Sequence, residues 1–171
     1  MSDAARRPVA IRLDKEAMKF SAGHFTIFGP GERERLHGHN FKVSVVLHAS
    51  VGEDGLCFDY GIYKRKVVAL CRAWNEYFLL PGRSPHLRIE EAGDTVVAVF
   101  GQERIPFLRK DVLVLPITNV TVEELAAHLL ERMTEDPRVL AGHRIEAIEL
   151  EVTSGPGQGA AMRWQAGAHG G

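Results

Sequence analysis

Alternating side chains over residues 37 to 49 constrain the fold of this chain most strongly. The odd positions carry histidine or apolar residues: His37, His39, Phe41, Val43, Val45 and Leu47. The even side carries polar residues: Asn40, Lys42, Ser44 and His48. Because successive side chains of a β-strand point to opposite faces, the pattern predicts a long strand whose odd positions face inward. The chain is therefore expected to build its core on a sheet.

The segments around this strand predict an α+β chain. A preceding strand is expected from Val9 to Phe25, with alternate residues up to His24 on one face. Apolar residues at helical spacing predict a helix from Ile62 to Phe78, and a second helix opens at the capping box Thr121 to Glu124. Further strands are expected from Ile145 to Thr153 and, after a glycine-rich loop, through Trp164. This order favours antiparallel pairing.

Residues 82 to 115 interrupt that order. Short β-like runs are expected at His86–Ile89, Val96–Phe100 and Val112–Leu115, with a turn signal at Gly93-Asp94. We expect an inserted hairpin or small sheet rather than a second domain. A length of 171 residues fits one domain over residues 1–171. The glycine-rich end, residues 166–171, is expected to be a frayed tail.

Charge and hydropathy argue against several classes of partner. The net charge of -1 provides no field that would draw nucleic acid or anionic lipid. No apolar run is long enough to span a bilayer, and the start lacks a signal-peptide core, so cytoplasmic residence is expected. Cys57 and Cys71 lack a Cys-x-x-Cys spacing and are expected to be two buried thiols.

Three histidines form a candidate metal site. His37 and His39 lie two residues apart on one strand, so both imidazoles project from the same face. His24 ends the preceding strand, and antiparallel pairing would place it beside them. Three neutral imidazoles suit zinc and leave a fourth position free for water or substrate. The alternative is that these are buried histidines satisfied by hydrogen bonds, which are commoner than ligands.

Longer motifs carry a family resemblance. Phe20-Ser21-Ala22-Gly23-His24 and Leu36-His37-Gly38-His39-Asn40-Phe41-Lys42-Val43 resemble the paired zinc motifs of the 6-pyruvoyltetrahydropterin and 6-carboxytetrahydropterin synthases. Gly55-Leu56-Cys57-Phe58-Asp59-Tyr60 and Asn119-Val120-Thr121-Val122-Glu123 are similar to motifs that precede the two helices of that family. The similarity spans most of residues 10 to 165, apart from the 82–115 segment.

The resemblance implies a fold, an assembly and a substrate class. The fold is the tunnelling fold, an antiparallel sheet with two helices on one face, with an inserted β segment around 82–115. Subunits of that family form a homo-oligomer, a hexamer built as a dimer of trimers, with active sites between subunits. The implied cofactor is zinc, and the implied substrate is a reduced pterin with a triphosphorylated side chain. Thr121, Val122, Glu123 and Val152 occupy positions that the resemblance assigns to substrate binding.

The chain departs from the family where a catalytic cysteine is expected. Arg33 stands in that place, and Glu34 follows it to give Glu-x-x-His-Gly-His. This arrangement is similar to a variant subgroup in which glutamate takes the cysteine's role and the product is a hydroxymethyl dihydropterin. A carboxylate beside a metal-bound substrate is a suitable general base. Alternatively, Glu34 only alternates with Arg33 and Arg35 on a solvated loop.

Two further departures concern catalysis and substrate recognition. Asn75 and Glu76 occupy the places of the family's Asp-His dyad, so Glu76 is a second candidate acid or base, or else a polar residue at the end of the first helix. Val152 stands where a glutamate pairs with the pterin ring, and the strand period points Glu151 away from the inward face. The leading hypothesis is a zinc-dependent pterin-type lyase with altered catalytic residues. The alternatives are a zinc- and ligand-binding homologue without synthase activity, and a purely structural zinc.

Overall fold

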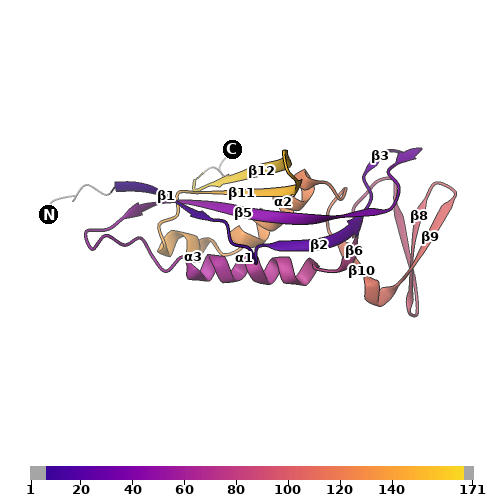
Figure 1. The fold of residues 1–171 in the computed structure, drawn as a ribbon, viewed down its shortest axis with the longest axis horizontal. Helices are drawn as coiled ribbons and strands as arrows, with labels where there is room; N and C mark the ends of the chain where they lie inside the picture. Colours follow the sequence, from indigo (N-terminus) through magenta and orange to yellow (C-terminus); the bar gives the residue numbers. More distant parts are fainter. Residues whose placement is uncertain (1–6, 168–171) are drawn as a thin grey trace.

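The computed structural model describes residues 7 to 167, and its central element is a seven-stranded sheet in the order β10-β6-β2-β5-β11-β12, with β1 also paired to β5. Its strands are β1 (Arg7–Leu13), β2 (Lys19–His24), β5 (His37–Val51), β6 (Tyr77–Pro81), β10 (Val112–Leu115), β11 (Ala147–Gly155) and β12 (Gln158–Gln165). The pairings of β6 with β2 and with β10 are parallel, and the others are antiparallel. The expected α+β class is confirmed (Figure 1).

The long strand β5 organises the sheet. Its first residues pair with β2, its later residues pair with β1, and β11 runs along its other edge. The expected single strand from Val9 to Phe25 is instead two strands. Asp14, Lys15 and Glu16 are three consecutive charged residues, which a strand with one buried face cannot accommodate, and the chain turns there with Met18 N–H donating to Lys15 O at 2.9 Å.

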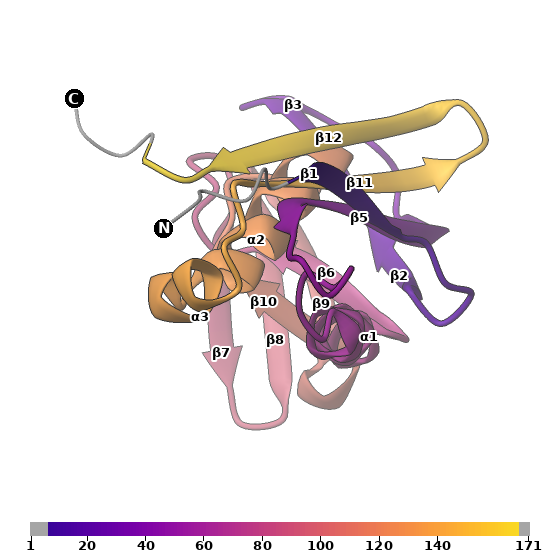
Figure 2. The ribbon, with the colours of Figure 1, turned by 90° about the vertical axis from the view of Figure 1, so that its left-hand side faces the viewer.

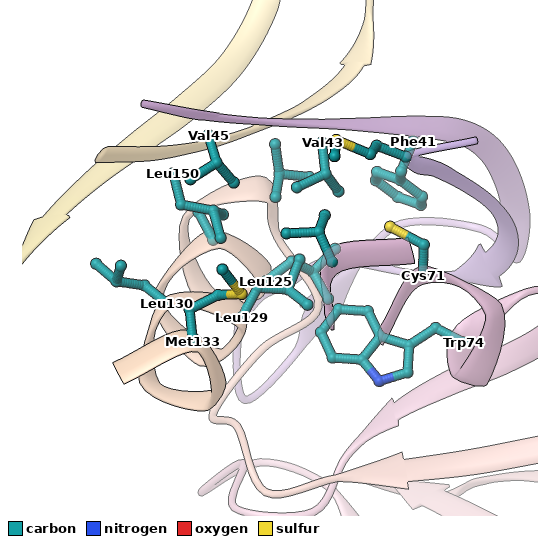
Figure 3. Packing of buried hydrophobic residues seen from close by; sticks show 14 of the residues in the cluster. Phe41, Val43, Val45, Cys71, Trp74, Leu125, Leu129, Leu130, Met133 and Leu150 are labelled. Atoms are coloured by element: carbon teal, nitrogen blue, oxygen red, sulfur yellow. The ribbon is translucent and has the colours of Figure 1, made fainter. Parts of the chain in front are cut away.

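Two main helices, α1 (Gly61–Trp74) and α2 (Val122–Thr134), cover one face of the sheet, together with the short α3 (Pro137–Gly142) (Figure 2). Phe41, Val43 and Val45 of β5 are at most 1% exposed. Their side chains point toward α2 and toward Cys71 and Trp74 of α1 (Figure 3). Burying each such side chain contributes about 1.5–3 kcal/mol. The alternation seen in the sequence is thus the core-forming pattern.

Helix α1 ends earlier than its apolar spacing predicts. Asn75 Oδ1 accepts a hydrogen bond from Ser21 N, and Glu76 N–H donates to Ser21 O at 2.7 Å. Glu76 adopts a positive φ of 66°, which is uncommon for a residue other than glycine and turns the chain out of the helix. The following segment is the strand β6, in which Leu79 and Leu80 are fully buried. The continuous apolar run of an interior strand explains why Tyr77 and Phe78 were expected within the helix.

The interval 82–115 contains the expected small sheet. Strands β7 (Arg88–Ala92), β8 (Thr95–Phe100) and β9 (Glu103–Leu108) pair antiparallel to form it, and a 3₁₀ turn η1 (Arg109–Asp111) leads back to β10 in the main sheet. Strand β9 was not expected. It contains Pro106, which a strand tolerates only at an edge, and β9 is an edge strand of this small sheet.

A second hairpin lies between β2 and β5. Its strands are β3 (Ile27–Gly29) and β4 (Glu32–Arg33), and it occupies the same end of the molecule as the inserted sheet (Figure 1). Phe25 and Ile27 at the base of this hairpin share an apolar cluster with Val96, Ala98 and Phe100 of β8. The hairpin and the inserted sheet are therefore packed against each other.

The remaining expectations concern the cysteines, the membrane and the tail. Cys57 and Cys71 are both free thiols; Cys71 is fully buried, which raises its pKa to about 12, whereas Cys57 is only partly buried. No helix in residues 7–167 is both long and apolar enough to cross a membrane. Of the expected frayed tail, residues 168–171 lie outside the described residues.

Candidate metal centre and its pocket

The pairing of β2 with β5 brings the three histidines together. His24 lies directly opposite His37, and Ala22 lies opposite His39, so the three imidazoles face the same side of the sheet. One nitrogen atom from each ring lies within 4.8 Å of the corresponding atoms of the other two. The ring centroids of His24 and His37 are 4.5 Å apart. This compact arrangement is the geometry that one ion needs to reach all three rings.

Backbone carbonyl groups fix two of the rings. His24 Nδ1 lies 2.9 Å from Val120 O, and His37 Nδ1 lies 2.8 Å from Arg35 O. A carbonyl oxygen can only accept, so each Nδ1 carries the proton and each Nε2 presents a lone pair. Metal-binding histidines are commonly oriented in this way by a carbonyl or carboxylate behind the ring. His37 Nε2 and His39 Nε2 are 3.1 Å apart and complete the set.

His24 provides the sharpest test of whether a cation fits. Its side chain is 5% exposed, and its Nε2 atom is buried without a hydrogen-bond partner among the described residues. A buried nitrogen without a partner is costly unless something absent from the protein chain satisfies it. Burial, together with the neighbouring His37 and His39, lowers the pKa of His24 despite the hydrogen bond to Val120. The ring is therefore held neutral, as a metal ligand must be, and the donor set fits zinc.

Two glycines allow the strands that carry the ligands to approach closely. A Cβ atom on Gly23 would lie 2.5 Å from Phe78 Cδ2 of β6, and one on Gly38 would lie 3.0 Å from Ala22 O. Gly23 and Gly38 are also direct partners in the β2–β5 pairing. A side chain at either position would force a neighbour to shift, namely the Phe78 ring next to Gly23 or the Ala22 carbonyl group next to Gly38.

Glu34 lies beside the histidines rather than on a free loop. Its backbone N–H donates to Thr26 O at 2.9 Å, and its carboxylate Oε2 accepts from Thr26 N at 2.9 Å. The same oxygen is 3.8 Å from His37 Nε2. Burial by itself would raise the pKa of Glu34, but the hydrogen bonds from Thr26 lower it overall. An ionised carboxylate is thus fixed at the edge of the histidine cluster.

These groups open into a cavity of about 420 Å³. Besides the three histidines and Glu34, its wall contains Thr26 and Phe28, Phe41 of β5, the helix-start residues Thr121, Val122 and Glu123, and Ser154, Gln158 and Gly159. Thr121, Val122 and Glu123 enter the wall because they form the start of α2, where Thr121 caps the helix by accepting from Glu124 N. The cavity therefore combines a candidate metal site with polar groups at a helix N-terminus.

Val152 and Glu76 lie elsewhere. Val152 is fully buried in the core and does not line the cavity, so its expected contact with substrate is not supported. The pairing of β11 with β12 shifts register between Thr153 and Gly155, and Ser154 at this bulge lines the cavity instead. Glu151 points to the opposite face, as the strand period predicts, near Ser44. Glu76 lines a second depression with Ser21, Asn40 and Asp111, which borders the histidine cavity at His39.

Several contributing groups were not found from the sequence. Val120 contributes only its carbonyl oxygen, which no side-chain pattern reveals. Asn119 accepts from Ile27 N and donates to Ile27 O, and so ties the segment that carries Val120 to β3. The Asn119 to Glu123 motif was the available signal, but it pointed to the helix start rather than to this bridge. Ser154 and Gln158 reach the cavity through a bulge and the glycine-rich turn after it; the sequence predicted the turn but not the bulge.

The fold and the site together define a class: a small α+β protein with a three-histidine pocket between a β-sheet and a helix N-terminus. The family model for 6-pyruvoyl tetrahydropterin synthase matches residues 13–164. The chain therefore belongs to the 6-pyruvoyl tetrahydropterin synthase family, and the resemblance inferred from its motifs is confirmed.

Similar proteins agree with this assignment. A candidate 6-carboxy-5,6,7,8-tetrahydropterin synthase of Methanocaldococcus jannaschii is 28% identical over 147 residues, which cover 85% of this chain and 90% of that protein. The structure of 6-pyruvoyl tetrahydropterin synthase from Plasmodium vivax superposes with a TM-score of 0.88 at 28% identity, covering 93% of this chain and 99% of that one. The Plasmodium falciparum protein gives a TM-score of 0.87 at 28% identity, with coverages of 92% and 98%. The expected tunnelling fold is confirmed.

Structures of two variants of the P. vivax protein are also among the similar structures. In these variants a glutamate described as a catalytic residue is replaced by cysteine or by alanine. Within this family, therefore, a solved relative has a catalytic glutamate.

Proposed function

We propose that this chain is a zinc-dependent enzyme of the pterin synthase type, with zinc held by His24, His37 and His39 and with Glu34 as general base. The observation that carries the proposal is the position of the Glu34 carboxylate, 3.8 Å from His37 Nε2 and facing the same cavity. The P. vivax relative supports this role, because one of its glutamates is described as catalytic.

The three histidines suit a catalytic metal rather than a structural one. Three protein ligands leave one position of a tetrahedral ion free, whereas structural zinc sites use four. Zinc bound here would supply Lewis acidity to polarise an oxygen of the substrate and favour loss of its proton. The buried Nε2 of His24, which has no hydrogen-bond partner in the described part of the chain, supports metal binding most directly.

Glu34 is suited to accept that proton. The net lowering of its pKa keeps it ionised at neutral pH, and the hydrogen bonds from Thr26 hold it in place. A base must lie within hydrogen-bond reach of the proton that it removes, and the shared cavity allows a small substrate to touch both Glu34 and the metal site. By the motif resemblance, the product would be a hydroxymethyl dihydropterin.

The heterocycle would be read by the wall formed at the start of α2. Glu123 offers a carboxylate that can accept from ring N–H groups, and Thr121 and Val122 offer backbone groups beside it. Val152 is buried in the core and does not contact the substrate in this proposal. We assign the substrate-binding role to Ser154 and Gln158 instead. The change from carboxylate to hydroxyl and amide at this wall predicts an altered preference among pterin-like substrates.

A second copy of the chain would complete the site. Glu76 does not line the histidine cavity, and its own depression shares only His39 with that cavity, so we infer that its expected acid–base role is performed in the site of a neighbouring subunit. We infer that the chain forms a single domain and assembles as a homo-oligomer, a hexamer of two trimers being the arrangement that the family resemblance implies.

A non-catalytic binding protein is the competing function, and the loss of the Asp-His dyad at Asn75 and Glu76 favours it. Incubation of zinc-loaded protein with dihydroneopterin triphosphate, followed by identification of products by mass spectrometry, distinguishes the enzyme from the binding protein. The enzyme hypothesis predicts a hydroxymethyl dihydropterin that a Glu34→Gln variant does not form. Tight binding of the pterin with no new product would reject synthase activity and leave the binding function.

A further inference from the structure

Arg33 connects the hairpin that carries Glu34 to the inserted sheet. Its guanidinium turns away from the histidine cavity: Nε donates to Glu103 Oε2 of β9 at 2.7 Å, and Nη2 donates to the same oxygen. Its Nη1 donates to the backbone carbonyl of Glu34 at 2.8 Å. The Arg33 side chain thus joins Glu34 to Glu103, which lies 70 positions after Arg33 in the sequence.

Two aromatic rings contact this guanidinium. Its carbon atom lies 5.2 Å from the ring centroid of Phe25 and 5.9 Å from that of Phe100. The Arg33 side chain is only 16% exposed, although Glu103 is 57% exposed. Cation–π contacts and a shared carboxylate make a more defined arrangement than an isolated surface ion pair.

The hairpin needs such support. Strand β3 has three residues and β4 has two, and an isolated two-stranded hairpin is at best marginally stable in water. Its base is covered by β8, because Phe25 and Ile27 pack with Val96, Ala98 and Phe100 in one apolar cluster. The inserted sheet therefore supplies both the apolar floor and the charged anchor of the hairpin.

We propose that the inserted sheet β7–β9 positions the Glu34 carboxylate, with Arg33 and Glu103 as the positioning residues. The proposal rests on the proposed role of Glu34 as base and explains what the 82–115 segment contributes to it. A catalytic group must be held to within about 0.5 Å by residues that are themselves fixed. Here Glu34 is held from one side by Thr26 and from the other by Arg33, whose own orientation depends on Glu103.

The turn between β8 and β9 places Glu103. Gly101 has a φ of 56°, a conformation that glycine adopts without strain, and Phe100 pairs directly with Glu103 across this tight hairpin. Glu103 therefore stands at the end of the inserted sheet that faces Arg33. The same sheet offers a matched control in Glu91, which pairs with Arg109 at 2.8 Å and makes no hydrogen bond or ion pair with the β3–β4 hairpin among the described residues.

The test is amide hydrogen exchange of peptides that cover residues 26–36 in the full-length, zinc-loaded protein. Glu103→Ala and Arg33→Met, which keeps an aliphatic stem against the two rings, should each speed exchange of the Glu34 amide about three- to fivefold, as loss of one partly exposed ion pair allows. Exchange in the double variant should be little faster than in either single variant, because the two substitutions remove the same contact. Glu91→Ala should leave this region unchanged.

Steady-state kinetics provides a measurement that a purely structural role of Glu103 would not change. If wild-type protein turns over the pterin, Glu103→Ala should lower kcat by a similar factor while KM, zinc stoichiometry and the unfolding midpoint stay as in wild type. Unchanged exchange at residues 26–36, or an equal effect of Glu91→Ala, overturns the positioning role. Amide exchange does not depend on turnover, so the two proposals fail separately. Absence of activity in the wild-type protein would reject the proposed function, whereas faster exchange in the variants would still show that Arg33 and Glu103 hold the hairpin in place.

Discussion

His24 and His37 lie directly opposite each other in the antiparallel pairing of β2 and β5, with their ring centroids 4.5 Å apart. Residues that face each other in this way are fixed by the register of the strands, since a slip of one position would turn His24 to the other side of the sheet. The same register faces Gly23 with Gly38. The geometry of the metal site is therefore a consequence of the core packing that sets this register.

Removal of a histidine ligand should abolish stoichiometric zinc binding. We expect one zinc per chain in wild-type protein and much less than one in His24→Ala, because the buried Nε2 of His24 has no hydrogen-bond partner within residues 7–167. His86, which is exposed and outside the cluster, serves as the control in His86→Ala. Metal content after dialysis, measured by mass spectrometry, checks this expectation. Equal zinc content in the His24 variant would contradict the assigned ligand set.

Zinc should stabilise the protein by mass action without being required for folding. At a free zinc concentration of about 100 times Kd, the free energy of unfolding should rise by about 2.7 kcal/mol. Chelation should reverse this gain and leave a cooperatively folded protein, because the core beneath β5 does not depend on the histidines. Thermal melts with and without chelator measure the difference. Complete unfolding upon chelation would indicate a structural metal instead.

Gly23→Ala should destabilise the protein by about 1–3 kcal/mol through overpacking. The new methyl group would lie 2.5 Å from Phe78 Cδ2, and β2 and β6 would have to separate. Gly31→Ala is the matched control, because a Cβ atom there meets nothing within 4 Å. Urea unfolding should show the loss for the first variant only, with partial recovery in Gly23→Ala/Phe78→Leu. Equal stability of both single variants would contradict the close strand contact.

Asn119→Ala should weaken both the fold and the zinc site. It removes the bonds that Asn119 makes with the backbone N–H and carbonyl of Ile27, at a cost of about 1–3 kcal/mol for groups left unpaired. It also loosens the segment that presents Val120 O to His24 Nδ1, so zinc affinity should fall on the order of tenfold. Competition with a chromophoric chelator measures that affinity. Thr118→Ala, which removes only an exposed bond to Glu124, should leave it unchanged.

Stability at alkaline pH should depend on Tyr63. Burial raises the pKa of Tyr63 to about 12. In the unfolded chain the phenol ionises near its ordinary pKa of about 10, so its contribution is fully present below that pH and is lost as pH rises toward 12. Urea midpoints of wild-type protein should therefore fall over this interval, and those of Tyr63→Phe should fall less. Parallel curves for the two proteins would contradict the burial of an un-ionised phenol.

The sequence predicts those parts of the structure that follow from local side-chain patterns. Alternation in β5 placed Phe41, Val43 and Val45 inward, and the two-residue spacing of His37 and His39 put both rings on one face. The capping box at Thr121 located the start of α2. These patterns are local, and local geometry alone decides them.

The features that the sequence did not predict depend on contacts between residues far apart in the chain or on a local irregularity such as a β-bulge. The end of α1 is set by two hydrogen bonds with Ser21 of β2: Asn75 Oδ1 accepts from Ser21 N, and Glu76 N–H donates to Ser21 O. A bulge at Ser154, rather than any feature of Val152, decides which residue faces the cavity. The ion pair of Arg33 with Glu103 joins two segments whose proximity only the folded chain reveals.

The central claim is that Glu34 performs proton transfer on a substrate held at the three-histidine site, and the turnover of dihydroneopterin triphosphate by Glu34→Gln tests it most directly. The control is Glu32→Gln, which removes an exposed carboxylate two residues away that does not line the cavity. The account predicts that the Glu34 variant keeps one zinc per chain but loses about 10²–10⁴ in kcat, as removal of a general base does, while the Glu32 variant matches wild type. Equal turnover by the Glu34 variant and wild type would contradict it.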